Sequence, residues 1–216
     1  MLGLLAPAAV ALLGALLSGG SPRYLSQARF RAWPVVALGF GVELVLYNPP
    51  FDGQPWAIAA GPWIWLTVRL LFVTVLVCNG WSGRAAWAWR LAALGVGLNT
   101  VCVAANGGHM PQSPEAALAV WGASQIDPQR LQNVSVMGPN THLAWLGDIF
   151  AEPAWLPRRS VVSAGDVLLA IGMAAWVYCA SLPGSTRTAL ARSKIGAGSA
   201  RRVDGAAGGA RQDLQR

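Results

Sequence analysis

Charged side chains are scarce in this chain. Asp, Glu, Lys and Arg together make up 12% of the 216 residues, whereas apolar residues make up 54%. A water-soluble domain normally carries about twice that proportion of charged residues. The mean hydropathy is +0.44, and the apolar residues are gathered into blocks. The composition therefore argues against a water-soluble globule and indicates an integral membrane protein.

Cysteine is scarce as well, with only Cys78, Cys102 and Cys179 in the whole chain. All three fall inside or at the edge of apolar blocks, and the long polar connection has none. We therefore expect small buried side chains rather than an extracytoplasmic disulfide.

Motifs that would indicate catalysis or cofactor binding are missing too. The sequence has no C-x-x-C, H-E-x-x-H or H-x-x-x-H spacing. It also has no convincing nucleophile elbow, P-loop or dinucleotide fingerprint. We therefore predict no cofactor, no metal site and no assigned catalytic residue, and whether the chain is an enzyme stays open.

Basic residues outnumber acidic ones by 16 to 9, a balance that can indicate a nucleic-acid partner. Their positions favour membrane topology instead, because basic residues collect in cytoplasmic loops. We therefore predict no nucleic-acid binding. Seven of them follow the last apolar block: Arg187, Arg192, Lys194, Arg201, Arg202, Arg211 and Arg216.

Five apolar blocks approach the roughly 20 residues that a helix needs to cross a bilayer. The first lacks a basic leader and is followed by arginines, which favours an uncleaved helix over a signal peptide. A Gly-Gly-Ser-Pro turn after it predicts a tight antiparallel hairpin with the second block. The five blocks are Met1–Leu17, Phe30–Tyr47, Ala57–Cys78, Ala85–Ala105 and Val161–Leu182.

Five further arginines lie in alternate connections, and the three in the outer segment, at residues 130, 158 and 159, are accompanied by four acidic residues. Residues 23, 29 and 31 follow the first block, and residues 84 and 90 border the fourth. This pattern places the N-terminus outside and the C-terminus in the cytoplasm. Residues 183–216 lack apolar periodicity and are predicted to form a disordered basic tail. We thus predict an all-α membrane bundle over residues 1–182, with a long ordered extracytoplasmic loop at 106–160.

Four polar side chains fall inside the predicted spans, at about 6 to 18 Å from the outer end. They are Glu43, Arg69, Asn99 and Asp166. Such groups are costly in hydrocarbon unless they are paired or hydrated, so we predict one cluster. Two interpretations stay open. Either Glu43 or Asp166 neutralises Arg69 to fix the helices in register, or the four line a polar pocket or an ion path.

The outer loop carries a second candidate site. About 55 residues are far more than a helix connection needs, so we expect the loop to fold over the bundle mouth. Two glycines permit positive φ, and Ser113 can cap a short helix that begins at Pro114. The candidate residues are Asn106, Gly107, Gly108, Met110, Pro111, His142 and Asp148.

The chain resembles an uncharacterised family of small bacterial multi-pass membrane proteins, classed as a domain of unknown function. The resemblance rests on Asn99, Asn106-Gly107-Gly108-x-Met110-Pro111, Ser113-Pro114-Glu115, Leu146-Gly147-Asp148 and Gly165-Asp166, and it covers about residues 1–182. It implies a location in the bacterial cytoplasmic membrane, but no substrate, cofactor or reaction.

Three functions are compatible with these residues. The first is a non-enzymatic structural, binding or assembly protein in the bilayer, whose outer loop and polar cluster recognise a lipid, a peptide or a partner membrane protein. The second is a small transporter or channel component that uses the polar cluster. The third is a membrane-embedded enzyme whose extracytoplasmic site is built from His109, His142, Asp148 and Asp166.

Overall fold

The computed structural model describes residues 2–81, 83–122, 133–156 and 159–183. The predicted disordered tail lies outside the described residues, apart from residue 183. The long helices are α1 (Leu2–Leu17), α3 (Trp33–Leu46), α4 (Pro55–Asn79), α5 (Ala86–Ala105) and α7 (Ala164–Ser181). The short elements are α2 (Pro22–Ser26), β1 (Met110–Gln112), α6 (Pro114–Trp121), β2 (Val134–Val136), η1 (Ala144–Leu146), β3 (Phe150–Ala151) and β4 (Val161–Val162).

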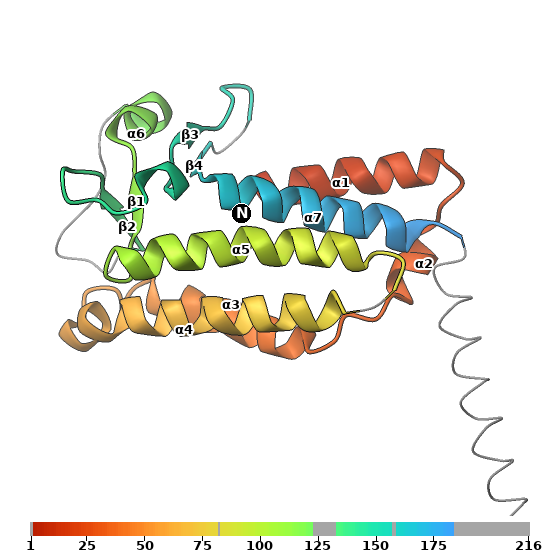
Figure 1. Cartoon of the computed structure of the whole chain (residues 1–216), viewed down its shortest axis with the longest axis horizontal. Helices are drawn as coiled ribbons and strands as arrows, with labels where there is room; N and C mark the ends of the chain where they lie inside the picture. The colour runs from red at the N-terminus through yellow and green to blue at the C-terminus, as the bar shows by residue number, and fades with distance from the viewer. Residues whose placement is uncertain (1, 82, 123–132, 157–158, 184–216) are drawn as a thin grey trace, which may run out of the picture.

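The five long helices lie alongside one another and alternate in direction along the chain, so that α1 and α7 run parallel (Figure 1). Each corresponds to one of the five predicted apolar blocks. Neighbours pack in the order α1, α7, α5, α4, α3. Three helices, α4, α5 and α7, are long and apolar enough to cross a membrane, whereas α1 and α3 are shorter apolar helices. The described chain is thus mainly helical and compatible with membrane insertion.

The predicted tight hairpin between the first two blocks is wrong. Helix α1 packs on α7, and α3 packs on α4 instead. The connection between α1 and α3 contains α2, which Ser21 caps by accepting a hydrogen bond from the Arg23 amide. The Ser21 amide donates to the carbonyl of Ser181 in α7 at 2.8 Å. The connection is therefore attached to α7, and α1 lies beside that helix.

The all-α prediction omitted two small sheets. Strand β1 pairs in parallel with β2, matching Met110 with Val134, and β3 pairs antiparallel with β4. These strands have only two or three residues, too few for an alternating pattern to stand out in the sequence. Val161 was expected to begin the last span, but it lies in β4, and α7 begins only after the Ser163 cap.

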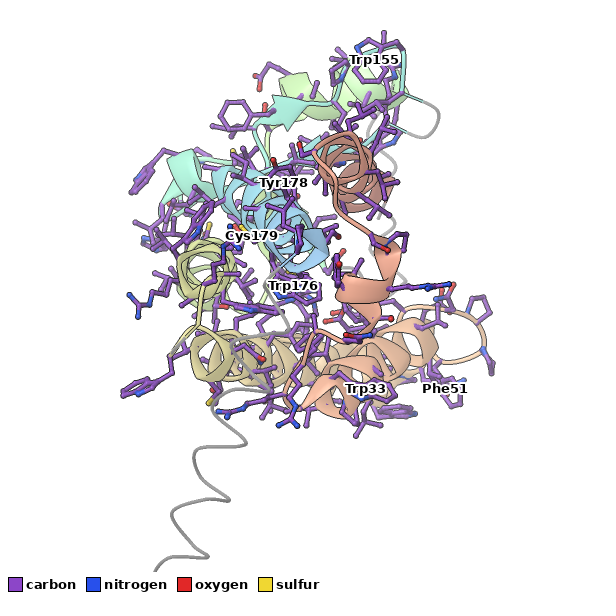
Figure 2. The ribbon with its side chains drawn as sticks, turned by 90° about the vertical axis from the view of Figure 1, so that its right-hand side faces the viewer. Trp33, Phe51, Trp155, Trp176, Tyr178 and Cys179 are labelled. Atoms are coloured by element: carbon purple, nitrogen blue, oxygen red, sulfur yellow. The ribbon has the colours of Figure 1, made fainter. Side chains whose placement is uncertain are left out.

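The molecule has two distinct ends. We call the one formed by residues 106–122, 133–156 and 159–163 the cap, and it lies at the left of Figure 1. We call the opposite end, formed by residues 18–32 and 80–85 and the end of α7, the base. In Figure 2, Trp33 and Phe51 lie at the edge of the bundle and Trp176 lies between helices. The long segment that we expected to be ordered is thus a folded cap within the described residues.

Candidate functional site

Arg69 in α4 forms an ion pair with Glu43 in α3. The Arg69 Nη2 atom lies 3.0 Å from Glu43 Oε1 and donates a 3.1 Å hydrogen bond to Oε2. The guanidinium carbon lies 4.9 Å from the centroid of the Trp65 ring and 5.6 Å from that of Phe72. Of the two partners that the sequence left open for Arg69, the structure selects Glu43.

Asn99 in α5 belongs to a second polar group with the start of α7. Its Nδ2 donates to Asp166 Oδ1 at 2.9 Å, and its Oδ1 accepts from the Ser163 hydroxyl at 2.8 Å. Ser163 and Asp166 also cap α7 reciprocally, each side chain accepting from the other residue's amide. Ser163 is fully buried. This group therefore fastens α5 to the first turn of α7.

A pocket of about 140 Å³ lies between these two groups and the cap. Arg69, Asn99 and Asp166 line it, and Asp148 lines it from the cap side. Glu43 is not among the described lining residues, so it contributes only through Arg69. Three of the four predicted cluster residues thus meet in one pocket, together with one residue of the outer-loop prediction. Its apolar lining comes from Trp65, Val96, Val103, Met110, Val134 and Leu169.

Asp148 is held in place by its backbone. Its amide donates to the Pro111 carbonyl at 2.8 Å, and its own carbonyl accepts from the Ser113 amide at 2.9 Å. The residue is only 8% exposed. Burial, and secondarily the charge of Asp166, raises the pKa of the Asp148 carboxyl to about 8. The cap thus contributes a carboxyl group that holds its proton at neutral pH.

The Asn106 side chain fastens the cap to the bundle. Its Nδ2 donates to the carbonyls of Cys102 and His142, both at 2.8 Å, and its Oδ1 accepts from the His142 amide at 2.9 Å. The end of α5 is therefore tied to a segment 36 residues further along the chain.

Backbone conformation favours glycine at both positions after Asn106, and packing adds a second requirement at Gly108. Gly107 and Gly108 adopt φ of +66° and +89°, which side chains disfavour. A Cβ on Gly108 would also collide with Pro62 of α4. The next motif residues, Met110 and Pro111, are buried in β1. These outer-loop candidates therefore build the cap, and only Met110 and Asp148 reach the pocket.

The histidines stand apart from the pocket. Neither His109 nor His142 is among its described lining residues, and His142 is exposed. Within the described ranges, no group of three His, Cys, Asp or Glu side chains could hold a metal ion. The proposed enzyme site of His109, His142, Asp148 and Asp166 thus reduces to its two carboxylates.

Sequence reasoning missed Ser163 and Trp65 as parts of the site. Ser163 had a readable signal, because Ser-x-x-Asp before an apolar run is typical of a helix start. Trp65 had none, since its contact with Arg69 and its place in the pocket depend on the rotation of α4 about its axis.

A model of a family of unknown function, DUF5317, matches residues 27–178 of the chain. The match covers more than half of the sequence. The chain belongs to DUF5317. Searches of curated proteins and of solved structures each found no match.

The DUF5317 match contains the complete pocket and the part of the base from residue 27 to residue 178, but neither α1 nor α2. It is narrower than the resemblance over residues 1–182 that the sequence motifs indicated. The part shared within DUF5317 therefore runs from the connection before α3 nearly to the end of α7.

In this DUF5317 protein, replacing Asn106 by Ala should loosen the cap. The substitution removes three hydrogen bonds and leaves the carbonyl of buried Cys102 and the backbone of exposed His142 without these partners, which costs about 1–3 kcal/mol. We expect faster amide hydrogen exchange over residues 138–148 and a lower melting temperature in detergent. Asn140→Ala is the control, since this exposed cap residue makes no hydrogen bond among the described residues. Equal exchange in the two variants would refute the role of Asn106.

Stability should fall as the pH rises because of Asp148. The folded pKa is about 8, against 3.8 for a free carboxyl, so the folded state retains a proton that the unfolded chain releases. Stability is greatest below the unfolded pKa and decreases between pH 4 and 8, by at most about 1.4 kcal/mol per pH unit. We expect Asp148→Asn to reduce the decrease in melting temperature between pH 4 and 8, whereas Glu115→Gln on the exposed cap surface should leave that decrease unchanged. If the melting temperatures of the wild type and Asp148→Asn depended on pH in the same way, Asp148 would not be the cause of the pH dependence.

Proposed function

We propose that this DUF5317 chain is a five-span membrane protein that binds a small cation beneath its cap and catalyses no reaction. The five spans are supported by the packing of α1 along α7 and of α3 along α4. At 1.5 Å per residue, α1 and α3 are about 24 and 21 Å long, so local thinning of the bilayer would compensate for their shortness.

The proposed orientation places the cap outside and the base in the cytoplasm of a bacterial cell. The described arginines at residues 23, 29, 31, 84 and 90 all lie at or near the base, whereas the described cap has only Arg159. Basic residues collect on the cytoplasmic side of a membrane. Large apolar side chains such as Leu38, Leu44 and Leu70 are more than half exposed, and lipid would cover them.

The observation that carries the binding function is the convergence of two carboxyl groups on one pocket. Asp148 comes from the cap and Asp166 from α7, and both line the 140 Å³ space. Arg69 is the only described base in the lining, and Glu43 already offsets its charge. With both aspartates ionised the site is therefore net negative, which favours a cation. The volume suits a few water molecules, a hydrated alkali ion or one small ammonium group.

Binding a cation at this pocket should release a proton. Asp148 is protonated at neutral pH in the empty pocket because its pKa is raised to about 8. A bound cation favours the ionised carboxylate, so affinity should increase with pH until Asp148 is already ionised. A purely structural cluster would have no such dependence.

Thermal unfolding of the detergent-purified chain tests this proposal. Sodium, potassium and methylammonium chlorides are compared at constant ionic strength, at pH 6.5 and pH 8.5. We expect at least one of these cations to raise the melting temperature, and to raise it more at pH 8.5. Asp148→Asn should abolish the stabilisation, whereas Glu115→Gln should retain it. No cation-specific stabilisation at either pH, or an unchanged response in Asp148→Asn, would overturn the proposal.

Transport through the polar cluster is the second candidate, favoured by the shared pocket of Arg69, Asn99 and Asp166. Below that pocket, however, Phe72, Leu76 and Trp89 form a packed apolar core toward the base. A route would require these side chains to separate. Cation flux into proteoliposomes that Asp148→Asn abolishes would favour transport over binding alone.

A further inference from the structure

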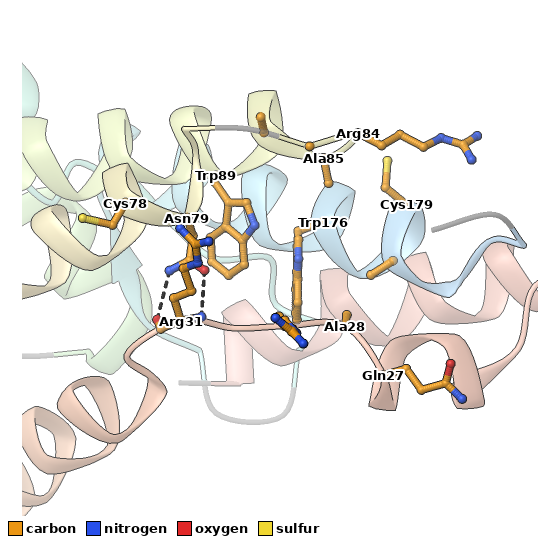
Figure 3. Close-up of a pocket in the computed structure, with 14 residues that line it drawn as sticks. Gln27, Ala28, Arg31, Cys78, Asn79, Arg84, Ala85, Trp89, Trp176 and Cys179 are labelled. Atoms are coloured by element: carbon orange, nitrogen blue, oxygen red, sulfur yellow. Dashed lines mark hydrogen bonds between the residues drawn. The ribbon is translucent and has the colours of Figure 1, made fainter. Parts of the chain in front are cut away.

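A second pocket, of about 270 Å³, opens at the base (Figure 3). Its wall is formed by the connection before α3, the connection between α4 and α5, and the last turns of α7. Arg29, Arg31 and Arg84 line it together with Asn79, Trp89 and Trp176. None of these residues belongs to the pocket beneath the cap.

Asn79 fixes the segment that carries two of the arginines. Its Oδ1 accepts from the Arg31 amide at 2.9 Å, and its Nδ2 donates to the Arg31 carbonyl at 3.0 Å (dashed in Figure 3). The same Nδ2 donates to the Val75 carbonyl within α4 at 2.8 Å. The backbone before α3 is therefore tied to the end of α4 at the pocket edge.

An aromatic cluster holds the segment from its other side. The Phe30 ring lies 5.0 Å from that of Trp89 and 6.2 Å from that of Trp176, and the two tryptophan rings are 4.8 Å apart. Phe30 thus packs into the bundle, while its two neighbours in the chain, Arg29 and Arg31, remain exposed at the pocket. The arginines are presented by a segment anchored both by hydrogen bonds and by ring contacts.

The charge of this pocket is not compensated within the described part of the chain. No described lining residue is acidic, and the one ion pair among the described residues joins Arg69 to Glu43 beneath the cap. Three arginines contribute to this lining, and Figure 3 shows the Arg31 side chain beside Asn79 and Trp89 while the Arg84 side chain extends away from them. A cluster of guanidinium groups favours a phosphate, which accepts several charge-assisted hydrogen bonds at once.

We infer that the base pocket binds the phosphate of an anionic phospholipid headgroup. The pocket lies where α4 ends and α5 begins, at the depth of the headgroups if these helices cross the bilayer. Exposed Trp81 and Trp87 flank it, as expected at a membrane interface. A lipid there would place its phosphate among the arginines and its acyl chains along the outer faces of the helices. The inference rests on the chain crossing a membrane and is independent of the cation site.

Native mass spectrometry of the full chain in a neutral detergent tests the inference. Dioleoyl phosphatidylglycerol and dioleoyl phosphatidylcholine are titrated separately, and inorganic phosphate forms a third arm. We expect phosphatidylglycerol to bind at least tenfold more tightly than phosphatidylcholine. Arg29→Gln and Arg31→Gln should each weaken phosphatidylglycerol binding about tenfold, since each removes a charge-assisted contact.

Arg23→Gln is the matched control, because Arg23 is exposed at the same end but does not line the pocket. It should leave phosphatidylglycerol affinity within about twofold of wild type. The inference is overturned if Arg23→Gln weakens binding as much as Arg29→Gln does, or if the two lipids bind equally. It is also overturned if inorganic phosphate binds as tightly as phosphatidylglycerol, since the site would then be one for free phosphate. If cations still stabilise the protein through the pocket beneath the cap, the failure concerns the lipid site alone and not the proposed function.

Discussion

Adding one methyl group at Gly95 should destabilise the protein by about 1–3 kcal/mol, the usual cost of overpacking. A Cβ at this position of α5 would meet the carbonyl oxygen of Gly165, and it would lie 2.7 Å from the Leu169 nitrogen. Both are backbone atoms of α7, so the clash cannot be relieved by a side-chain rotation. The two helices would have to separate, which would also disturb the hydrogen bonds between Asn99 and α7.

Gly97→Ala in the same helix is the control for this prediction. A Cβ there meets nothing within 4 Å, and alanine is the better helix former by about 1 kcal/mol. We therefore expect Gly95→Ala to lower the melting temperature in detergent and Gly97→Ala to leave it unchanged or raise it. Gly172→Ala, whose Cβ would lie 2.6 Å from the Ala92 nitrogen, should behave like Gly95→Ala. Equal melting temperatures for Gly95→Ala and Gly97→Ala would show that α5 and α7 are not in close contact.

Removing Arg69 alone should cost about 3 kcal/mol or more, because it leaves Glu43 partly buried without its cation. The two side chains are only 21% and 14% exposed, so water screens them poorly. Arg69→Met also removes the guanidinium from the face of Trp65, where it lies 4.9 Å from the ring centroid. Arg69→Met should therefore be among the least stable single variants.

The double variant Glu43→Gln/Arg69→Met should recover much of the loss, since no charge is then left without a partner. The measurement is a double-mutant cycle on the free energy of unfolding in detergent, with Glu43→Gln as the other single variant. We expect a coupling energy of about 2 kcal/mol. Additive effects would mean that the pair does not interact, and that Arg69 is neutralised elsewhere.

The sequence predicted the long helices of this protein, but it did not predict which of their side chains pair with one another. The lengths of the apolar blocks predicted all five long helices to within three residues at each end, with the largest differences at the starts of α3 and α7. Helix α3 begins at Trp33 and not at Phe30, and α7 begins at Ala164 and not at Val161. Ser113 followed by Pro114 predicted the start of α6, and its hydroxyl accepts from the Ala116 amide. These features are local, because the apolar length and the capping residue lie within the segment itself.

The neighbours of each helix could not be predicted in this way. The long helices are apolar on nearly every face, and a helix without a distinct polar side carries little information on its rotation or its partner. The short turn after α1 suggested a hairpin with α3, but the attachment of Ser21 to Ser181 placed α1 beside α7. Contacts of this kind join residues far apart in the chain, and the spacing of residues does not record them.

By itself, the sequence determined that this chain folds as apolar helices with a structured cap, and that the few polar groups within those helices lie at similar levels along the bundle. These properties follow from the cost of placing apolar side chains in water and charges in hydrocarbon. Only the tertiary structure decided that Arg69 pairs with Glu43, that Asn99 binds Asp166, and that Asp148 of the cap faces the same pocket. Those choices depend on helix order and rotation, which close contacts such as that between Gly95 and Gly165 set.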